Sequence, residues 1–201
     1  MDHHGRRAFL RNAVGTAALT LTSRSGIFGH THTLSVSAKL AEGATTLPDR
    51  LPPAWYRRKI GEIQRAMATR NLDALVLLRA PNVIYATGYF HLSTERPLAA
   101  LIPKSGDPAL FVPGLESDQV KLWWVNDFEA YFDYPGPVDR IRWIFERVAK
   151  RGFGRSRIGV EEPVPSRLQQ MKLGAPDTEI VDAGDLIEQM RWIKGDVKLL
   201  V

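Results

Sequence analysis

Residues 82–97 read N-V-I-Y-A-T-G-Y-F-H-L-S-T-E-R-P, and this stretch stands out from the rest of the sequence. A short helix is expected over residues 82–87, because Pro81 stands where a helix start tolerates proline and Gly88 where a helix end favours glycine. The polar residues that follow indicate a loop, and an extended run begins at Pro97. The stretch therefore joins a helix to a strand through a loop that carries polar and aromatic side chains.

Helical and extended patterns alternate on both sides of this stretch. A continuous apolar run at residues 74–78 indicates a strand buried on both faces, and the turn at residues 104–107 indicates a hairpin. Further strands are expected at residues 97–102, 109–112, 128–132, 157–161 and 179–181, and helices at residues 54–70, 115–124, 138–150, 166–173 and from Asp185 onward. The pattern predicts an α/β domain of three layers, with a mixed, about six-stranded sheet and helices on both faces.

Two local patterns refine this prediction. Asp185 and Glu188 have the spacing of a capping box that opens the last helix, whose inner face would carry Leu186, Ile187, Met190 and Ile193. The adjacent residues Trp123 and Trp124 cannot both point inward from one helix. One of these indoles is therefore expected to meet a partner domain or subunit.

The amino-acid composition excludes several kinds of functional site. The 201 residues include no cysteine, which excludes a disulfide, a Cys nucleophile and a thiolate zinc site on this chain. The net charge is +5, but four arginines and one aspartate place +3 of it on residues 1–38, which leaves +2 for the rest. No Lys/Arg run with interleaved aromatic residues is present, so nucleic acid is not expected as a partner.

The basic N-terminus resembles a twin-arginine export signal. Residues 5–11 read G-R-R-A-F-L-R and precede a weakly apolar run that is too short to span a membrane. The expected organisation is a signal over residues 1–38, a linker over 39–53, a folded domain over 54–190 and the start of a junction over 191–201. The protein would then be periplasmic or extracellular, with His91 as its one histidine after cleavage. The alternative is a cytoplasmic protein with a basic N-terminal helix.

Few residues suggest chemistry of their own. Phosphate-binding glycine loops, H-E-x-x-H and G-x-S-x-G are absent, and Gly152-Phe153-Gly154 reads as a helix terminator. Carboxylates stand at strand ends and helix starts without a spacing that would bring them together on a metal: Glu116, Asp118, Asp127, Asp133, Glu161 and Glu162. We interpret these six carboxylates as solvated surface residues, and no metal ligand or catalytic residue is predicted.

The sequence resembles the N-terminal domain of the creatinase/prolidase family, also called the pita-bread or Xaa-Pro peptidase family. Residues 82–90 are similar to that family's N-I-x-Y-L-T-G-F-like segment, and residues 94–97 to the T-E-R-P loop of one subgroup. Residues 190–196 are similar to the R-x-I-K-S junction that leads into its catalytic domain. The resemblance covers residues 54–201, so the chain is expected to be a truncated product or fragment that stops at the junction.

The resemblance implies a function that this chain would not perform alone. In the family, the catalytic domain holds two divalent metals, Mn, Co or Zn, which activate water for attack on a peptide bond. No metal ligand is carried over to this chain, so it is expected to be inactive by itself. As partners, the resemblance implies a homodimer or the catalytic domain, and a peptide substrate only in the full-length parent.

Three residues are candidates for contact with substrate in a partner's active site. The resemblance places Arg96 where a family arginine holds a substrate carboxylate, although Arg96 could instead pair with Glu95. His91 could orient substrate or cap the loop, and Tyr89 could wall a pocket or belong to the core. Two alternative functions remain: a stand-alone dimerisation or binding module, and the N-terminal part of a creatinase-like amidinohydrolase.

Overall fold

The computed structural model describes residues 51–92, 94–132, 139–161 and 163–193. The predicted signal, most of the linker and the end of the junction lie outside these residues, as do Asp133 and Glu162. No helix within the described ranges is long and apolar enough to cross a membrane.

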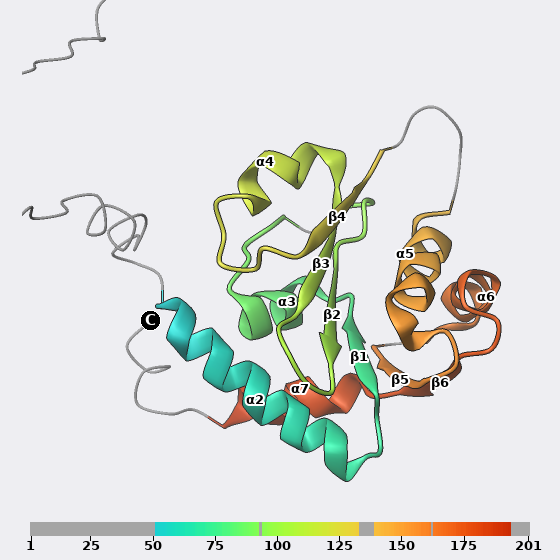
Figure 1. Ribbon diagram of the computed structural model, residues 1–201, viewed down its shortest axis with the longest axis horizontal. Helices are drawn as coiled ribbons and strands as arrows, with labels where there is room; N and C mark the ends of the chain where they lie inside the picture. The colour runs from blue at the N-terminus through green and yellow to red at the C-terminus, as the bar shows by residue number, and fades with distance from the viewer. Residues whose placement is uncertain (1–50, 93, 133–138, 162, 194–201) are drawn as a thin grey trace, which may run out of the picture. The chain divides into compact units, whose positions relative to one another are not determined.

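Six strands form one mixed sheet (Figure 1), whose order is β4-β3-β2-β1-β5-β6. The strands are β1 (Ala74–Leu77), β2 (Ala99–Pro103), β3 (Ala109–Pro113), β4 (Phe128–Tyr131), β5 (Arg157–Val160) and β6 (Glu179–Asp182). Strand β2 is antiparallel to both its neighbours, and the other three pairs are parallel. The hairpin and the mixed sheet predicted from sequence are confirmed.

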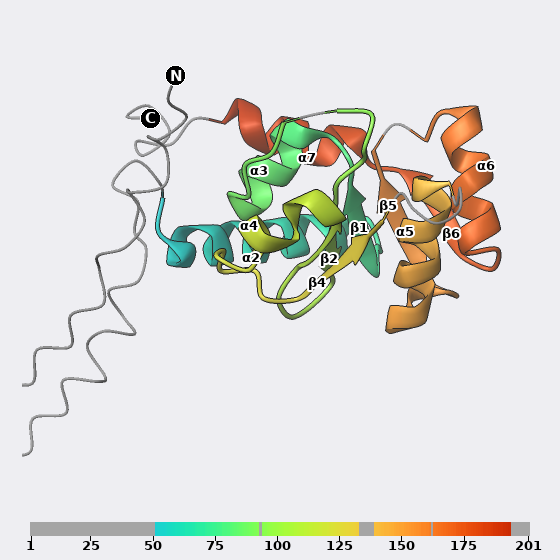
Figure 2. The ribbon, with the colours of Figure 1, turned by 90° about the horizontal axis from the view of Figure 1, so that it is seen from above.

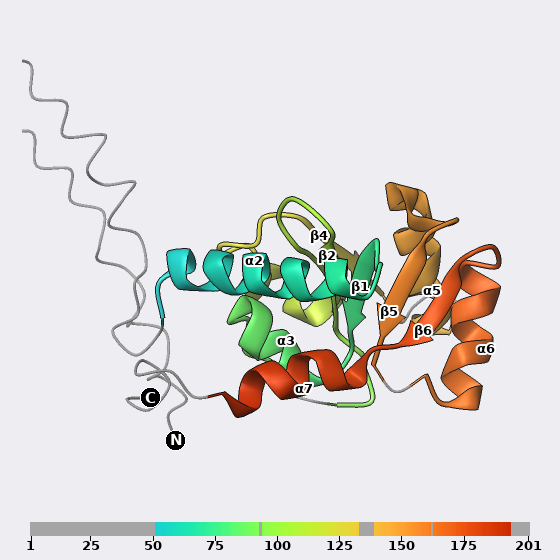
Figure 3. The same cartoon turned by 90° about the horizontal axis from the view of Figure 1, so that it is seen from below.

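Helices cover both faces of the sheet. They are α2 (Pro53–Thr69), α3 (Ala80–Thr87), α4 (Ser117–Val120), α5 (Arg140–Val148), α6 (Pro165–Gly174) and α7 (Gly184–Trp192), with a 3-10 turn, η1 (Gly114–Glu116), and a π-helical turn, η2 (Ala149–Phe153). In Figures 2 and 3, α2, α3 and α7 lie together with α3 between the other two, and α5 and α6 lie apart from them.

The alternation of side chains along β1 explains these layers. Leu75 and Leu77 enter the core under α2, α3 and α7, whereas Ala74 and Val76 enter the core under α5 and α6. All four side chains are fully buried, as the continuous apolar run predicts for a central strand. The three-layer α/β prediction is therefore confirmed.

Gly88 ends α3 as the sequence predicts. Its φ is 71°, in the left-handed region that glycine adopts without strain. A Cβ at this position would lie 2.3 Å from Cζ of Tyr56, so the ring of Tyr56 uses the space that the absent side chain leaves. The chain can thus turn sharply out of α3 while α2 packs closely against the turn.

Three predicted helices differ from the structure. The helix expected over residues 115–124 is only η1 and α4, which end at Val120, and the helix expected over 138–150 ends at Val148 before the π-helical turn. The capping box of the last helix is wrong, because α7 begins without a side-chain cap. Asp185 binds Arg70 and Glu188 pairs with Arg79, so both carboxylates join α7 to other elements. Ile193, predicted to face inward, is 74% exposed.

Candidate functional site

The loop between α3 and β2 begins at a firmly held turn. The carbonyl oxygen of Thr87 accepts a hydrogen bond from Nε1 of Trp123 at 2.8 Å and another from Nε1 of Trp124 at 2.7 Å. The hydroxyl of Thr87 donates to the carbonyl of Val83 and accepts from the backbone N–H of Tyr89. These four bonds fix the point at which the chain leaves the helix.

The two tryptophans correct the prediction that one of them faces a partner. Both are partly buried and pack against the core, and both lie after the end of α4 rather than on a regular helix. Because the backbone there turns, the two indoles can reach the same carbonyl oxygen. Tyr56 stacks on Trp124 with ring centroids 6.3 Å apart, so the aromatic cluster joins α2 to the start of the loop.

Tyr89 anchors the next residue of the loop. Its ring is 1% exposed, and its hydroxyl lies 3.0 Å from Oε2 of Glu116 in η1. Burial raises the pKa of Tyr89, and the hydrogen bond to the Glu116 carboxylate adds to the rise. The phenol therefore stays protonated at neutral pH and donates to Glu116.

His91 lies beside Tyr89. The two rings stack with centroids 6.3 Å apart and an interplanar angle of 19°, and His91 is 8% exposed. Its buried Nδ1 atom finds no hydrogen-bond partner within the part of the chain that the structure describes. Burial lowers the pKa of His91, opposed by the backbone of Tyr89 and the charge of Glu116, so this imidazole favours its neutral form.

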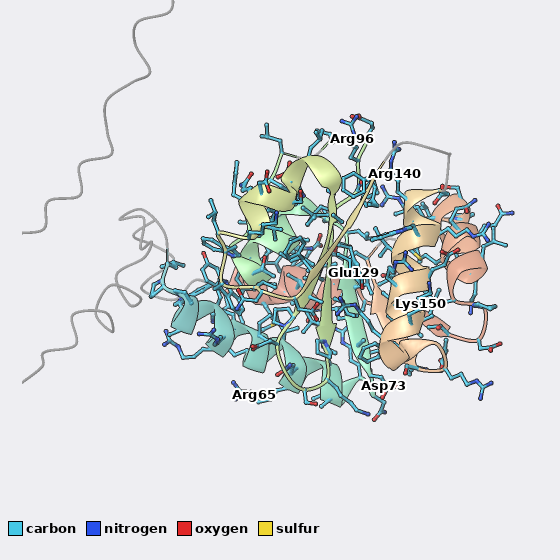
Figure 4. All side chains as sticks on the ribbon, turned by 45° about the horizontal axis from the view of Figure 1, so that its top comes forward. Arg65, Asp73, Arg96, Glu129, Arg140 and Lys150 are labelled. Atoms are coloured by element: carbon cyan, nitrogen blue, oxygen red, sulfur yellow. The ribbon has the colours of Figure 1, made fainter. Side chains whose placement is uncertain are left out.

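Arg96 stands at the far end of the loop. Its guanidinium lies 3.2 Å from Oε1 of Glu95, which is the structural alternative weighed from the sequence, and its backbone N–H donates to Oγ1 of Thr94. Figure 4 shows Arg96 at the opposite end of the domain from Arg65 and Asp73. Since Glu95 is largely exposed, the pair is screened by solvent and can exchange for another carboxylate.

Four exposed apolar side chains lie on this loop or on the segments that contact it, and we call them the apolar rim: Phe90, Leu92, Leu115 and Phe132. Phe90 and Leu92 flank His91, and Leu115 precedes the carboxylate that holds Tyr89. The ring of Phe132 lies against Gly114, where an added Cβ would meet it at 2.5 Å. Phe90 and Leu92 are thus exposed on the loop, next in sequence to the buried rings of Tyr89 and His91.

Glu161 is the polar residue that the sequence interpretation missed. The interpretation of Glu161 as a solvated surface carboxylate is wrong, because the structure buries it completely at the end of β5. Oε2 accepts the backbone N–H groups of Leu78 and Arg79 at 2.6 and 2.8 Å, and Oε1 accepts Nδ2 of the fully buried Asn82. Its position after a buried strand, beside a helix start with free N–H groups, was the available signal.

Two further predicted surface carboxylates, Asp118 and Asp127, are each paired with a basic side chain. Asp127 binds Arg151, whose guanidinium lowers the pKa of that carboxyl, and Asp118 pairs with Lys121. Within the described ranges, no three side chains of His, Cys, Asp or Glu come together as a metal site would require. The described residues therefore do not fit a dinuclear metal centre.

The family model of the creatinase/prolidase N-terminal domain matches residues 59–193 of this chain. Among curated proteins, an uncharacterized peptidase of Staphylococcus epidermidis is 32% identical over 143 residues, which are 71% of this chain and 38% of that protein. A putative dipeptidase of Bacillus subtilis is 28% identical over 118 residues, 57% of this chain and 32% of its own. The chain therefore spans under two fifths of the length of either relative.

Solved structures share the fold. The N-terminal domain of a Xaa-Pro dipeptidase from Lactobacillus brevis superposes with a TM-score of 0.54 at 22% identity, covering 66% of this chain and 99% of that one. A prolidase from Thermococcus sibiricus gives a TM-score of 0.61 at 19% identity, covering 72% of this chain and 39% of that one. At these identities the likeness concerns the arrangement of strands and helices.

Proposed function

This chain belongs to the creatinase/prolidase N-terminal domain family, and we propose that it works as the non-catalytic N-terminal domain of an exported metallopeptidase of the Xaa-Pro type. In this proposal the two divalent metals are held by a region outside this chain. The domain contributes dimer contacts and a loop that reaches substrate in the partner subunit's active site. The names of the relatives, peptidases and a putative dipeptidase, favour a peptide substrate over the small amidino substrate of creatinase.

The construction of the α3–β2 loop is the observation that carries the proposal. Its start is fixed by the two indoles and by the bond from Tyr89 to Glu116, while the apolar rim and Arg96 stand outside these anchors. A loop that is held at its base loses little conformational entropy when it meets a ligand. Arg96 supplies the guanidinium fork that a peptide carboxylate requires, and His91 supplies a neutral imidazole.

The role of the loop can be tested by substitution in the protein that includes both this chain and the metal-binding region. The variant Arg96→Ala should lose about tenfold to a hundredfold in kcat/KM for Xaa-Pro dipeptides, as expected when a charged hydrogen bond is removed. Arg65→Ala, at the opposite end of the domain, is the matched control and should retain activity.

A mixture of two kinds of subunit shows whether the loop acts across the dimer. Arg96→Ala subunits combined with subunits whose metal site is inactivated should regain activity, because each intact active site is then served by the partner's intact loop. If the mixture stays as inactive as its components, Arg96 acts within its own subunit or not at all.

Export is a separate part of the proposal. The twin arginines of residues 6–7 precede a weakly apolar run, which supports the twin-arginine route. Residues 1–38 fused to a reporter that is exported only after folding should deliver it across the membrane. Replacing Arg6 and Arg7 together by lysine should block delivery, whereas Arg24→Lys should not. Equal export by the two variants would favour another route or none.

A further inference from the structure

Three residues form a polar chain from the end of β5 to the last turn of α7. Oε1 of Glu161 accepts from Nδ2 of Asn82, and Oδ1 of Asn82 accepts from Nη1 of Arg191 at 2.8 Å. Glu161 and Asn82 are fully buried, and Arg191 is partly buried. We call these three hydrogen-bonded residues the Glu161 relay. The relay joins elements that are distant in sequence.

Donor and acceptor chemistry fixes the orientation of Asn82 in this relay. An ionised carboxylate only accepts hydrogen bonds, and a guanidinium only donates them. The amide of Asn82 must therefore turn its NH₂ group toward Glu161 and its oxygen toward Arg191. The direction of each bond in the relay follows from the charge on Glu161.

Protonation reverses that direction. Oε2 already accepts two backbone N–H groups, so a proton taken up from solvent would form its O–H bond at Oε1. Oε1–H is a donor, and it requires the oxygen of Asn82. Once the amide has turned, its NH₂ group faces Arg191, which cannot accept a hydrogen bond. Arg191 then loses its bond to α3.

We propose that the Glu161 relay is a proton-controlled latch on α7: the ionised carboxylate holds the last turn of the helix against α3, and the protonated carboxylate releases it. Among the described residues, Arg79 is the charged group that acts on Glu161, and Arg79 itself pairs with Glu188 of α7. Burial disfavours the ionised carboxylate and prevails over the hydrogen bonds from Arg79, Asn82 and Leu78 and over the charge of Arg79, so the pKa of Glu161 is raised. The latch operates within the domain itself, independently of the proposed peptidase role.

The contact of Tyr85 with α7 cannot replace the relay. Its hydroxyl lies 3.4 Å from the carbonyl oxygen of Met190, a long hydrogen bond. Burial raises the pKa of Tyr85 to about 12, so this phenol keeps its proton over the range in which a carboxyl titrates. The Arg79–Glu188 pair lies one turn earlier on α7 and is partly exposed. The bond from Arg191 is therefore the contact that responds to Glu161.

Hydrogen exchange on the 201-residue chain tests the latch through the substitution Glu161→Gln. The glutamine oxygen can keep the two backbone bonds, and its NH₂ group then faces Asn82 as the protonated acid would. Amides in the last turn of α7 should exchange roughly tenfold faster in this variant at about pH 8, with those of β1 and β5 changed less. In the wild-type protein the same acceleration, after correction for intrinsic exchange, should appear as the pH falls through the raised pKa of Glu161.

Two further variants keep the test decisive. Arg191→Met cuts only the last link, so it should accelerate exchange in α7 to the same extent, and adding Glu161→Gln to it should have no further effect. Glu188→Gln removes the neighbouring surface pair and should leave the pH dependence intact. Exchange in α7 that is unchanged in Glu161→Gln, or that follows β1 and β5 in every variant, would overturn the latch.

Discussion

The hydroxyl of Tyr89 donates to the carboxylate of Glu116 across 3.0 Å and thereby ties the start of the α3–β2 loop to the turn that follows β3. The ring beneath this bond is buried and stacks on His91. A single side chain thus joins the core, the loop and an acidic group. The candidate site depends on this anchor more than on any exposed residue.

Removing the hydroxyl should loosen the loop without emptying the core. Tyr89→Phe keeps the ring and should lower the unfolding free energy by about 1.5–3 kcal/mol, the net value of a hydrogen bond to a charged group. Urea denaturation measures this loss. Tyr85→Phe is the matched control and should cost less, because the hydrogen bond from the Tyr85 hydroxyl to the carbonyl oxygen of Met190 is long, at 3.4 Å. Equal losses in the two variants would show that the Tyr89–Glu116 bond has no special strength.

Gly88 should tolerate substitution poorly. Gly88→Ala places a Cβ 2.3 Å from the ring of Tyr56 at a positive φ, so we expect a loss of about 2–4 kcal/mol in unfolding free energy. Gly106 also has a positive φ, but a Cβ added there would meet open space. Gly106→Ala should therefore lower the unfolding free energy by only about 1 kcal/mol. A difference near zero between the two variants, measured by thermal or urea unfolding, would remove Tyr56 from the explanation.

The two indoles on Thr87 should behave non-additively. Trp123→Phe and Trp124→Phe each leave the carbonyl with one donor, so each should lose about 0.5–1.5 kcal/mol from its hydrogen bond. The double variant leaves the carbonyl unsatisfied in a buried place and should lose more than the sum. Urea denaturation followed by circular dichroism measures the unfolding free energy of the wild type, the two single variants and the double variant. A simple sum would mean that the bonds act independently.

The stability of the protein should carry the pH signature of Glu161. Its pKa in the folded state lies above the ordinary value of 4.5, so the folded protein binds this proton more readily than the unfolded chain does. The penalty for ionisation is absent below the unfolded value and grows as the pH rises through the folded-state pKa. The unfolding free energy of the wild type minus that of Glu161→Gln should therefore increase as the pH falls through this window.

Asp127 provides the control of opposite sign. Arg151 lowers the pKa of its carboxyl, so the stability it contributes is present above its unfolded value and lost as the pH falls. The difference between the wild type and Asp127→Asn should consequently decrease toward low pH. If both differences changed in the same direction, the burial of Glu161 would not dominate its titration.

Local signals in the sequence were sufficient for most of the fold. Pro81, Gly88 and the apolar run of β1 act on their own neighbourhood, and each element they predicted is present. Glu161 was misread because its burial depends on Leu78, 83 residues away, whose N–H group it accepts. The capping box failed for the same reason, since Arg70 and Arg79 bind the two carboxylates from distant elements. Partners that are remote in sequence leave no periodic pattern.

We propose that this chain contributes a loop and contacts to a peptidase whose hydrolytic centre is held by another region. A peptidase assay of the purified 201-residue protein with Xaa-Pro dipeptides and added manganese or cobalt tests it most directly. We predict no turnover above the blank without protein. Turnover that copurifies with the chain and is lost in Arg96→Ala would contradict the account, because it would place the active site on this domain.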